Sequence, residues 1–283
     1  MAAEKTNKPG KVILAGAGPG DPDLITVKAV RYLQQADVVL TDRLVSNDIL
    51  KAYVNPSAEV IYVGKQCRRG TSTPQETINR LMLEHAGQGK LVVRLKGGDT
   101  TVFSNILDEL HALSQNHIAY EIIPGITAAL GAAAYAGIPL TARGYATAVR
   151  LLTYYKSDVV PDQYWQELAT TNDTLVFYMS AETVEGIVSK LIRYGAGRDK
   201  HIAVIEQATT SLQQVHTANI HDYLQQFQGM SFISPSLVII GKVVALHEQF
   251  AWLPNAPERE QYFKSIATLQ NNSINQQAHV SRA

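Results

Sequence analysis

The chain has one cysteine, no excess charge and no long apolar segment, and each absence excludes a class of protein. Cys67 lacks a second thiol for a disulfide or a cysteine zinc cluster, which is typical of a reducing compartment. Lysine plus arginine and aspartate plus glutamate both total 25, whereas general nucleic-acid and membrane-surface binders carry a basic excess. No segment approaches the about 18 uninterrupted apolar residues of a membrane-spanning helix, and none follows Met1 as a signal peptide would require. We therefore expect a cytoplasmic protein with no nucleic-acid and no membrane partner.

Histidine is present but shows no metal-binding pattern. Among the eight histidines, His216 and His221 are close in sequence but fall on different expected elements, and no carboxylate–histidine cluster accompanies them. We predict no metal.

Short runs of Val, Ile and Leu alternate with segments of helical period. With 46% apolar and 18% charged residues, the chain of 283 residues can bury the core of one large or two medium domains. The alternation predicts an α/β fold with a mainly parallel sheet. In the first half, the pattern predicts helices over 24–35 and 74–85, and strands over 11–16, 37–41, 59–64, 91–95 and 119–123.

The alternation is interrupted at residues 136–144, which contain two glycines and a proline, and then resumes. The later segments predict a helix over 181–194 and strands over 148–155, 174–179, 201–206, 213–218 and 237–244. We therefore predict an N-terminal α/β domain over 11–140 and a C-terminal α/β domain over 145–253. Residues 1–10 and 256–283 are polar and weakly periodic, so we expect flexible ends.

A glycine loop follows the first predicted strand. Gly16, Gly18 and Gly20 allow close approach of the backbone to a ligand, and Asp42 lies where a dinucleotide fold places the acid that binds ribose. The spacing is GxGxG, however, and Pro19 lacks an N–H donor for a pyrophosphate. A dinucleotide site is disfavoured, and a tight turn without a ligand stays open.

Two more turns rich in small residues follow predicted strands. Gly97, Gly98 and Asp99 end the fourth strand, and residues 124–129 follow the fifth, where they form either a further ligand contact or the start of a helix. In open α/β sheets ligands bind at the carboxyl ends of the strands. Three such turns favour a common ligand.

These motifs, in this order, resemble the tetrapyrrole methylase family, and within it the uroporphyrinogen-III C-methyltransferases. The match extends to Trp252 and omits only the two ends. The segments that carry it are 16–22, 24–26, 36–40, 42–46, 63–65, 74–75, 94–99, 124–129, 135–141, 174–179 and 234–237.

The resemblance implies a homodimer with two α/β domains and S-adenosylmethionine in a cleft between them. By the same matching, Asp42 resembles the family's proton acceptor and Lys65 its proton donor. The family's glycine after the third strand of the second domain is Ala208 here. The positions that match the family's cofactor site are Pro19, Gly97, Gly98, Asp99, Val102, Thr127, Ala128, Met179 and Ala208.

The implied reaction is methylation of uroporphyrinogen III at ring carbons 2 and 7, which gives precorrin-2 for siroheme or cobalamin synthesis. This substrate carries eight carboxylates, which a neutral protein has to meet with local positive charge, and arginine suits carboxylates. The candidate substrate-binding residues are Arg43, Arg68, Arg69, Arg94, Arg143 and Arg150.

Besides Ala208 and a stretch from Lys65 to Pro74 that is one residue longer than usual, the chain departs from the family pattern in three places. Residues 100–109 lack the family's proline and arginine, residues 142–144 replace its His-Arg-Asp, and Thr153-Tyr154-Tyr155 replaces its Thr-Gly-His. The alternatives are a sister methyltransferase of a later corrin precursor, an NAD-dependent oxidoreductase and a non-catalytic tetrapyrrole-binding module.

Overall fold

The chain divides after Thr127 into two compact units, of which the second is Ala128–Tyr262. We describe each unit by itself, from a computed structural model that covers residues 10–63, 73–155 and 158–263. The predicted boundary at residues 140–145 lies further along the chain. The division falls earlier because α5 (Ala128–Tyr135) packs against a strand of the second unit.

Within the described residues, the first unit contains a parallel sheet of five strands in the order β3-β2-β4-β1-β5. A short 3₁₀ turn, η1 (Pro22–Leu24), follows the first glycine loop. The strands are β1 (Lys11–Gly16), β2 (Val38–Thr41), β3 (Glu59–Tyr62), β4 (Leu91–Lys96) and β5 (Ala119–Ile123). The helices are α1 (Val27–Leu33), α2 (Asn47–Tyr53), α3 (Gln75–Gly87) and α4 (Ile106–Gln115).

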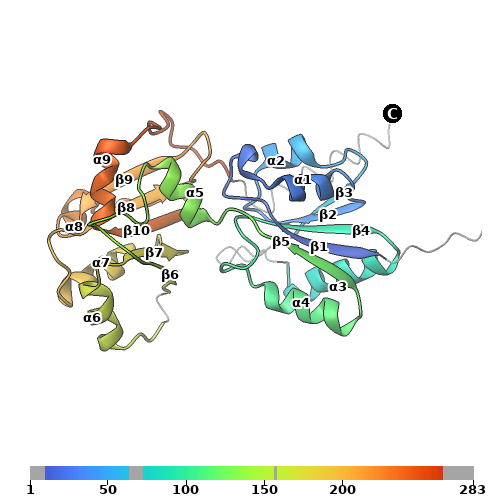
Figure 1. Ribbon diagram of the computed structural model, residues 1–283, viewed down its shortest axis with the longest axis horizontal. Helices are drawn as coiled ribbons and strands as arrows, with labels where there is room; N and C mark the ends of the chain where they lie inside the picture. Colours follow the sequence, from blue (N-terminus) through green and yellow to red (C-terminus); the bar gives the residue numbers. More distant parts are fainter. Residues whose placement is uncertain (1–9, 64–72, 156–157, 264–283) are drawn as a thin grey trace, which may run out of the picture. The chain divides into compact units, whose positions relative to one another are not determined.

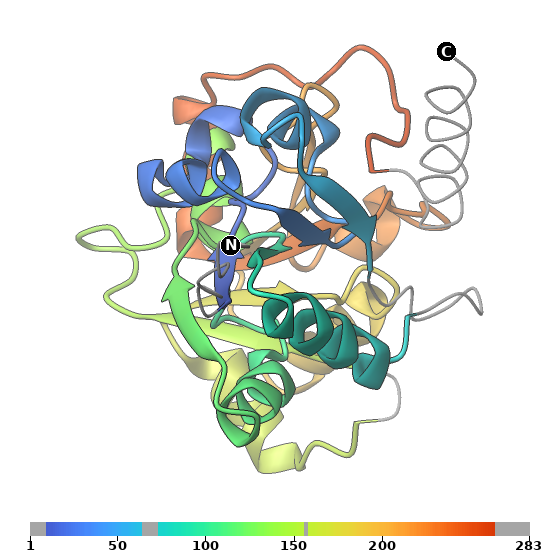
Figure 2. The same cartoon turned by 90° about the vertical axis from the view of Figure 1, so that its right-hand side faces the viewer.

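Helices cover both faces of this sheet, with α1 and α2 on one face and α3 and α4 on the other (Figures 1 and 2). The central strands β1 and β4 are buried after their first residue because both of their faces are covered, as is typical of parallel sheets. They are apolar except for Lys11 at the start of β1 and for Arg94 and Lys96 in β4. Thr26 and Ser46 begin α1 and α2, and their hydroxyls accept hydrogen bonds from Ala29 N and Ile49 N. These caps fix where the chain turns from the carboxyl edge of the sheet into a helix.

The second unit has a mixed sheet in the order β6-β7-β10-β8-β9 over its described residues. Only β6 and β7 pair in parallel, while β10 is antiparallel to β7 and β8, and β9 is antiparallel to β8. The strands are β6 (Val149–Thr153), β7 (Thr174–Tyr178), β8 (His201–Glu206), β9 (Gln214–Asn219) and β10 (Ser236–Gly241). The helices are α5, α6 (Asp162–Thr170), α7 (Val184–Arg193), α8 (Tyr223–Gln226), η2 (Lys242–Leu246) and α9 (His247–Phe250).

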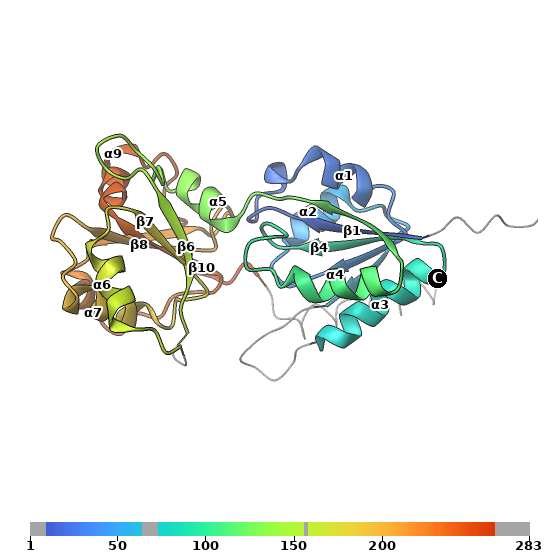
Figure 3. The ribbon, with the colours of Figure 1, turned by 60° about the horizontal axis from the view of Figure 1, so that its bottom comes forward.

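Helices α6, α7 and α8 lie along one face of this second sheet (Figures 1 and 3). In the core on that face Trp165 of α6, Ile187 of α7 and Tyr223 of α8 pack with the strands. On these elements the apolar residues recur with helical spacing, so the buried faces follow from the sequence. The antiparallel pairs do not follow from it. The alternation of strands and helices predicted a mainly parallel fold, which is correct for the first unit and wrong for the second.

The predicted C-terminal flexible end also differs from the structure in its first residues. Residues 256–262 are hydrogen bonded to the second unit, for example through Ala256 N to Gln213 O at 3.1 Å and Tyr262 N to Gln207 Oε1 at 2.6 Å. The other predicted end, residues 1–9, and residues 264–283 lie outside the described residues. Across the described ranges, none of the helices is both long and apolar enough to cross a bilayer.

Candidate functional site

The loops after β1 and β4 join at the carboxyl edge of the first sheet. Gly18 N donates to Gly98 O at 3.0 Å and Gly98 N donates to Gly18 O at 2.7 Å, so the two glycine loops form a small antiparallel bridge. Both glycines have positive φ, 79° and 71°, which other residues rarely adopt. The sequence predicted that these two loops lie at one edge of the sheet, and the structure shows that they are also hydrogen bonded to each other.

Three glycines of this edge are needed because backbone packs on backbone. A Cβ on Gly16 would lie 2.7 Å from Gly125 N, and a Cβ on Gly125 would lie 2.3 Å from Gly98 O. A Cβ on Gly97 would lie 2.7 Å from the Cβ of Leu44, next to Asp42. The glycines therefore bring the loops after β1, β2, β4 and β5 into contact with one another, which preforms the edge for a ligand.

Asp99 connects two of these loops through its carboxylate. Oδ1 accepts hydrogen bonds from Thr101 N at 2.7 Å, Thr101 Oγ1 at 2.6 Å and Val102 N at 3.2 Å, and Oδ2 accepts one from Gly125 N at 2.9 Å. Burial raises the pKa of this carboxyl, but the hydrogen bonds outweigh burial and the net pKa is lowered. Asp99 is 8% exposed, so its side chain shapes the loop from within.

Asp42, the candidate proton acceptor, follows β2 and faces the glycine loop. Its Oδ1 accepts a hydrogen bond from Leu44 N at 2.9 Å and its Oδ2 accepts one from Gly97 N at 3.3 Å. A carboxylate has about four acceptor positions, so each oxygen keeps capacity for another proton donor. The structure therefore places a half-buried carboxylate beside Gly97, and its role as the proton acceptor stays a prediction.

Arg43 lies beside Asp42 and is half-buried. Burial lowers the pKa of the guanidinium, and the charge of Asp42 partly counteracts that effect. Among the described residues, no hydrogen bond or ion pair engages the Arg43 side chain. Within the described ranges its planar donors therefore have no carboxylate partner.

Arg94 is not retained as a substrate-binding residue, because its charge is buried and satisfied inside the protein. It is 4% exposed, and its Nε donates to Glu109 Oε1 at 3.0 Å while Nη1 donates to Leu40 O and Leu95 O. Lys96 Nζ donates to the other oxygen of Glu109 at 2.8 Å. This triad ties α4 to β4 beneath the glycine loop.

The segment after Asp99, where the family pattern breaks, has a strained backbone. Thr100 is fully buried, and Phe103 and Asn105 have φ of 51° and 53°. Ser104 Oγ donates to Thr100 O and closes the loop on itself. The segment thus holds a defined turn before α4 without the family's proline and arginine.

In the second unit, the ends of β6, β7 and β8 lie at one edge, because these three strands run in the same direction. Met179 follows β7, is 51% exposed and has φ of 54°. Tyr155, after β6, donates its hydroxyl proton to Met179 Sδ at 3.2 Å, and Tyr178 Oη accepts a hydrogen bond from Ala129 N at 3.1 Å. The second contact joins the end of β7 to the start of α5, where the predicted cofactor residue Ala128 lies.

Ala208 lies in the turn that follows β8, between two residues with positive φ, Gln207 at 48° and Thr209 at 65°. Thr209 N donates to Gln213 Oε1 at 2.8 Å, and Gln207 N donates to Pro235 O at 2.8 Å. Ala208 is half-buried. The structure therefore places Met179 and Ala208 at the same edge of the second sheet.

The remaining predicted residues divide into three groups. Pro19, Val102 and Thr127 are half-buried on the loops of the first unit. Arg143 is exposed in the second unit, whereas Arg150 is paired with Glu167 at 2.5 Å and Asp173 at 2.6 Å, so its charge is already committed. The residues outside the described ranges are Lys65, Arg68 and Arg69.

Sequence reasoning missed the residues that support these loops from behind. Glu109, Tyr178 and Gln207 were not candidates, because apolar spacing gives no sign of a buried polar partner. Tyr155 did carry a signal, since it lies in the altered Thr-Gly-His segment. Over the described ranges, no group of three or more His, Cys, Asp or Glu residues gathers as a metal site would require.

The two units thus form an α/β protein with preformed glycine loops at the carboxyl edge of a parallel sheet, the class of enzyme that binds a small-molecule cofactor there. Residues 11–223 match the family model of tetrapyrrole (corrin/porphyrin) methylases. The chain belongs to the tetrapyrrole methylase family, and the predicted resemblance and fold are confirmed.

Among curated relatives, a siroheme synthase of Saccharophagus degradans is 46% identical over 252 residues, which are 89% of this chain and 55% of that protein. A siroheme synthase of Pseudomonas fluorescens is 46% identical over 248 residues, 88% of this chain and 53% of that protein. The chain therefore spans about half the length of the curated relatives it matches.

Solved structures of similar length also match. A cobalt precorrin-4 methyltransferase superposes with a TM-score of 0.73 at 30% identity, over 83% of this chain and 95% of that one. A uroporphyrin-III C-methyltransferase of Thermus thermophilus, complexed with S-adenosylhomocysteine, has a TM-score of 0.68 at 35% identity, over 83% of this chain and 93% of that one.

Proposed function

We propose that this chain transfers methyl groups from S-adenosylmethionine to uroporphyrinogen III at ring carbons 2 and 7, giving precorrin-2 for siroheme or cobalamin synthesis. The observation that carries the proposal is the 35% identity to a uroporphyrin-III C-methyltransferase that binds S-adenosylhomocysteine, with Asp42 held beside the Gly97 loop. Homology to siroheme synthases supports the same pathway.

The residues present fit an adenosyl cofactor. Such a ligand requires a largely apolar surface with a few backbone polar groups. Except for Asp99, whose carboxylate is hydrogen bonded within the loops, the candidate residues are small or apolar, and Gly97 leaves room where a side chain would meet Leu44. The residues that we expect to hold the cofactor are Pro19, Gly97, Gly98, Asp99, Val102, Thr127, Ala128, Met179 and Ala208.

S-adenosylmethionine, when bound, would supply a sulfonium methyl group for transfer to a pyrrole carbon of the substrate and would leave as the neutral thioether S-adenosylhomocysteine. We assign to Asp42 the role of accepting the proton that this carbon loses; the assignment is supported by the acceptor capacity that its oxygens keep after the hydrogen bonds from Leu44 and Gly97. The rigid loops orient the reacting groups, and orientation supplies several kcal/mol of rate acceleration. We keep Lys65 as the proposed proton donor on the family match alone.

The substrate's carboxylates require cations, and two of the proposed arginines remain available in the described residues. Arg43 is half-buried without an ion pair there, and Arg143 is exposed. Arg68 and Arg69 stay in the proposal on their sequence position. Arg150 is a weaker candidate, because Glu167 and Asp173 already neutralise it.

We further propose that the protein is a homodimer in the cytoplasm. The family resemblance supports the dimer, and the single Cys67 suits a reducing compartment. Light scattering coupled to size-exclusion chromatography measures the mass directly; a monomer at micromolar concentration would contradict the dimer.

The reaction is tested anaerobically with enzymatically made uroporphyrinogen III and S-adenosylmethionine, with product mass as the readout. We expect a gain of two methyl groups. No gain, with S-adenosylhomocysteine binding intact, would overturn the proposed substrate. A parallel binding measurement with NAD tests the oxidoreductase alternative, for which we expect no binding.

A methyltransferase of a later corrin precursor is the second candidate, favoured by the TM-score of 0.73 to a cobalt precorrin-4 methyltransferase. The identity to that structure, 30%, is lower than the 35% to the uroporphyrin-III enzyme. Supplying cobalt precorrin-4 in the same assay separates the two, since methylation of that compound alone would select the second candidate.

A further inference from the structure

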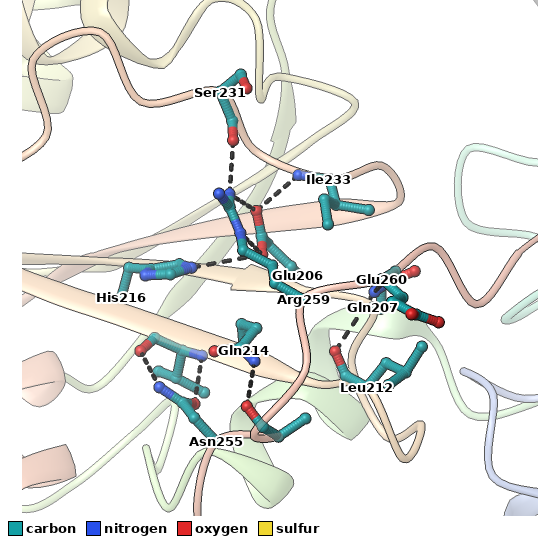
Figure 4. Close-up of polar contacts among 12 residues, drawn as sticks. Glu206, Gln207, Leu212, Gln214, His216, Ser231, Ile233, Asn255, Arg259 and Glu260 are labelled. Atoms are coloured by element: carbon teal, nitrogen blue, oxygen red, sulfur yellow. Dashed lines mark hydrogen bonds and ion pairs between the residues drawn. The ribbon is translucent and has the colours of Figure 1, made fainter.

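Residues 255–262, which we call the C-terminal strap, run along the edge of β9 and the turn before it (Figure 4). Asn255 pairs with the backbone of Val215, accepting from its N–H at 2.7 Å and donating to its carbonyl at 3.1 Å. Gln214 Nε2 donates to Ala256 O at 2.6 Å. The strap is therefore fastened to the second unit by specific hydrogen bonds.

Arg259 is the charged contact between the strap and the sheet. Its Nη2 donates to Glu206 Oε1 at 2.7 Å and to Ser231 O at 2.6 Å, and its Nε donates to Glu206 Oε2 at 3.3 Å. Ile233 N also donates to Glu206 Oε1, and His216 Nε2 lies 3.4 Å from Oε2 (Figure 4). Glu206 is fully buried at the end of β8, so the strap supplies the counter-charge of a buried acid.

Gln207, the residue after Glu206, connects the strap to the turn over residues 207–213, which contains the proposed cofactor residue Ala208. Gln207 Nε2 donates to Glu260 O at 2.8 Å, and its Oε1 accepts from Tyr262 N at 2.6 Å. Gln207 and Thr209 both have positive φ, a conformation that side chains disfavour and that persists only where the surroundings enforce it. The hydrogen bonds from the strap hold Gln207, and the Gln213 side chain holds Thr209, so the residues on both sides of Ala208 are kept in this conformation.

We propose that Arg259 is a positioning residue for the adenosyl cofactor: through Glu206 and Gln207 it holds the 207–213 turn, and therefore Ala208, in the conformation that binds the cofactor. This inference rests on the proposed function, which assigns Ala208 to the cofactor site. If only a fraction of the molecules has the turn in the binding conformation, the apparent Kd for the cofactor equals the intrinsic Kd divided by that fraction. A saturating cofactor concentration restores the bound conformation.

The test compares Arg259→Gln and Arg259→Lys with wild type in the full chain. If the competent turn falls to about a tenth of the population in Arg259→Gln, the Kd for S-adenosylhomocysteine rises about tenfold by calorimetry. We expect KM for S-adenosylmethionine to rise by a similar factor while kcat at saturation stays within about twofold. Arg259→Lys keeps the positive charge but cannot contact both oxygens of Glu206 as the guanidinium does, so we expect intermediate values of Kd and KM.

Hydrogen exchange supplies a readout that does not depend on activity. The amides of Gln207, Thr209 and Thr210 donate hydrogen bonds within the turn or to Pro235, and we expect them to exchange faster in Arg259→Gln while the amides of β8 stay protected. Arg198→Gln is the matched control, because Arg198 is an exposed arginine of the same unit whose side chain has no polar contact among the described residues.

Wild-type affinity and unchanged turn exchange in Arg259→Gln would overturn the inference. Removal of the counter-charge of Glu206 also lowers overall stability, so a loss of protection that is equal in the turn and throughout the second unit would overturn it too, since Arg259 would then act on overall stability alone. If Arg259→Gln does not fold, Arg259→Lys decides between the same outcomes. Wild type that binds no S-adenosylhomocysteine contradicts the proposed function instead, and the exchange comparison still shows whether the strap holds the turn.

Discussion

The carboxylate of Asp99 accepts a hydrogen bond from the backbone N–H of Gly125 at 2.9 Å and thereby joins the loop after β4 to the loop after β5. The same carboxylate also accepts three hydrogen bonds from Thr101 and Val102. The Asp99 side chain thus fixes the loops after β4 and β5, and both loops contain or adjoin residues that we propose to contact the cofactor. A preformed site of this kind loses little conformational entropy when it binds a ligand.

Asp99→Asn tests this anchor. The amide group of asparagine would present N–H to a backbone donor, so at least one buried hydrogen bond is lost, and we expect the free energy of unfolding to fall by about 1–3 kcal/mol. Urea denaturation measures the change. Asp108→Asn, an exposed acid on α4, is the control and should match wild type. Equal stability of Asp99→Asn and wild type would contradict the anchoring role.

Asp42→Asn separates proton transfer from folding. Asparagine keeps an oxygen for the Leu44 amide but is a far weaker base, so we expect kcat to fall by at least about 100-fold. The Kd for S-adenosylhomocysteine should stay within about threefold, because the hydrogen bond from Leu44 N is kept and the one that asparagine cannot accept, from Gly97 N, is long at 3.3 Å. Glu59→Gln, at the opposite end of the same sheet, is the control. Unchanged kcat would remove Asp42 from the mechanism.

The sequence predicted the strand over 201–206 at its observed limits, because its apolar run between polar ends corresponds to a buried strand. The strand over 119–123 was also predicted at its observed limits, although only Ile123 of it is fully buried. Strand direction in the second unit was not predictable, since a buried strand has the same apolar pattern in either direction. Helix α5 also gave little signal: its sequence, AALGAAAY, is small and apolar on all sides and shows no amphipathic face.

The sequence predicted the parts of the candidate site where the backbone geometry requires a particular residue type. It predicted less well the side chains whose role depends on a partner that is distant in the sequence. Gly16, Gly97 and Gly125 stood out because only glycine fits there. Arg94 was assigned to the substrate because its sequence position near a strand end shows no partner. That partner, Glu109, is fifteen residues away on α4, and only the packing of α4 on β4 brings them together.

Arg43 and Arg94 should therefore behave differently when each is changed to glutamine. Arg43→Gln removes one charge-assisted contact, so we expect KM for uroporphyrinogen III to rise about tenfold with unchanged stability. Arg94→Gln leaves Glu109 with an incomplete partner and should lower the free energy of unfolding by about 3–5 kcal/mol. Steady-state kinetics and urea denaturation measure the two effects, with the exposed Arg31→Gln as control for both. A similar KM increase in both variants would restore Arg94 as a substrate ligand.

Glu206 makes stability depend on pH in a defined window. Burial raises the pKa of this carboxyl, but His216, Arg259 and the Ile233 amide outweigh burial and lower it to about 2, from an ordinary value of 4.5. Because the folded pKa lies below the unfolded one, the charged form stabilises the fold fully above pH 4.5, and that stability is lost as pH falls from 4.5 toward 2. The contribution at neutral pH is about 3 kcal/mol.

Other acids also titrate in this range, so the difference between Glu206→Gln and wild type is the quantity to measure. We expect urea denaturation to show a large difference at pH 7 that shrinks as pH falls from 4.5 toward 3, because protonation removes the advantage of the native glutamate. Glu84→Gln is the control: it breaks an exposed pair with Arg80 and should change stability by less than about 1 kcal/mol at every pH. A difference between Glu206→Gln and wild type that stays constant with pH would show that Glu206 acts through packing and not through its charge.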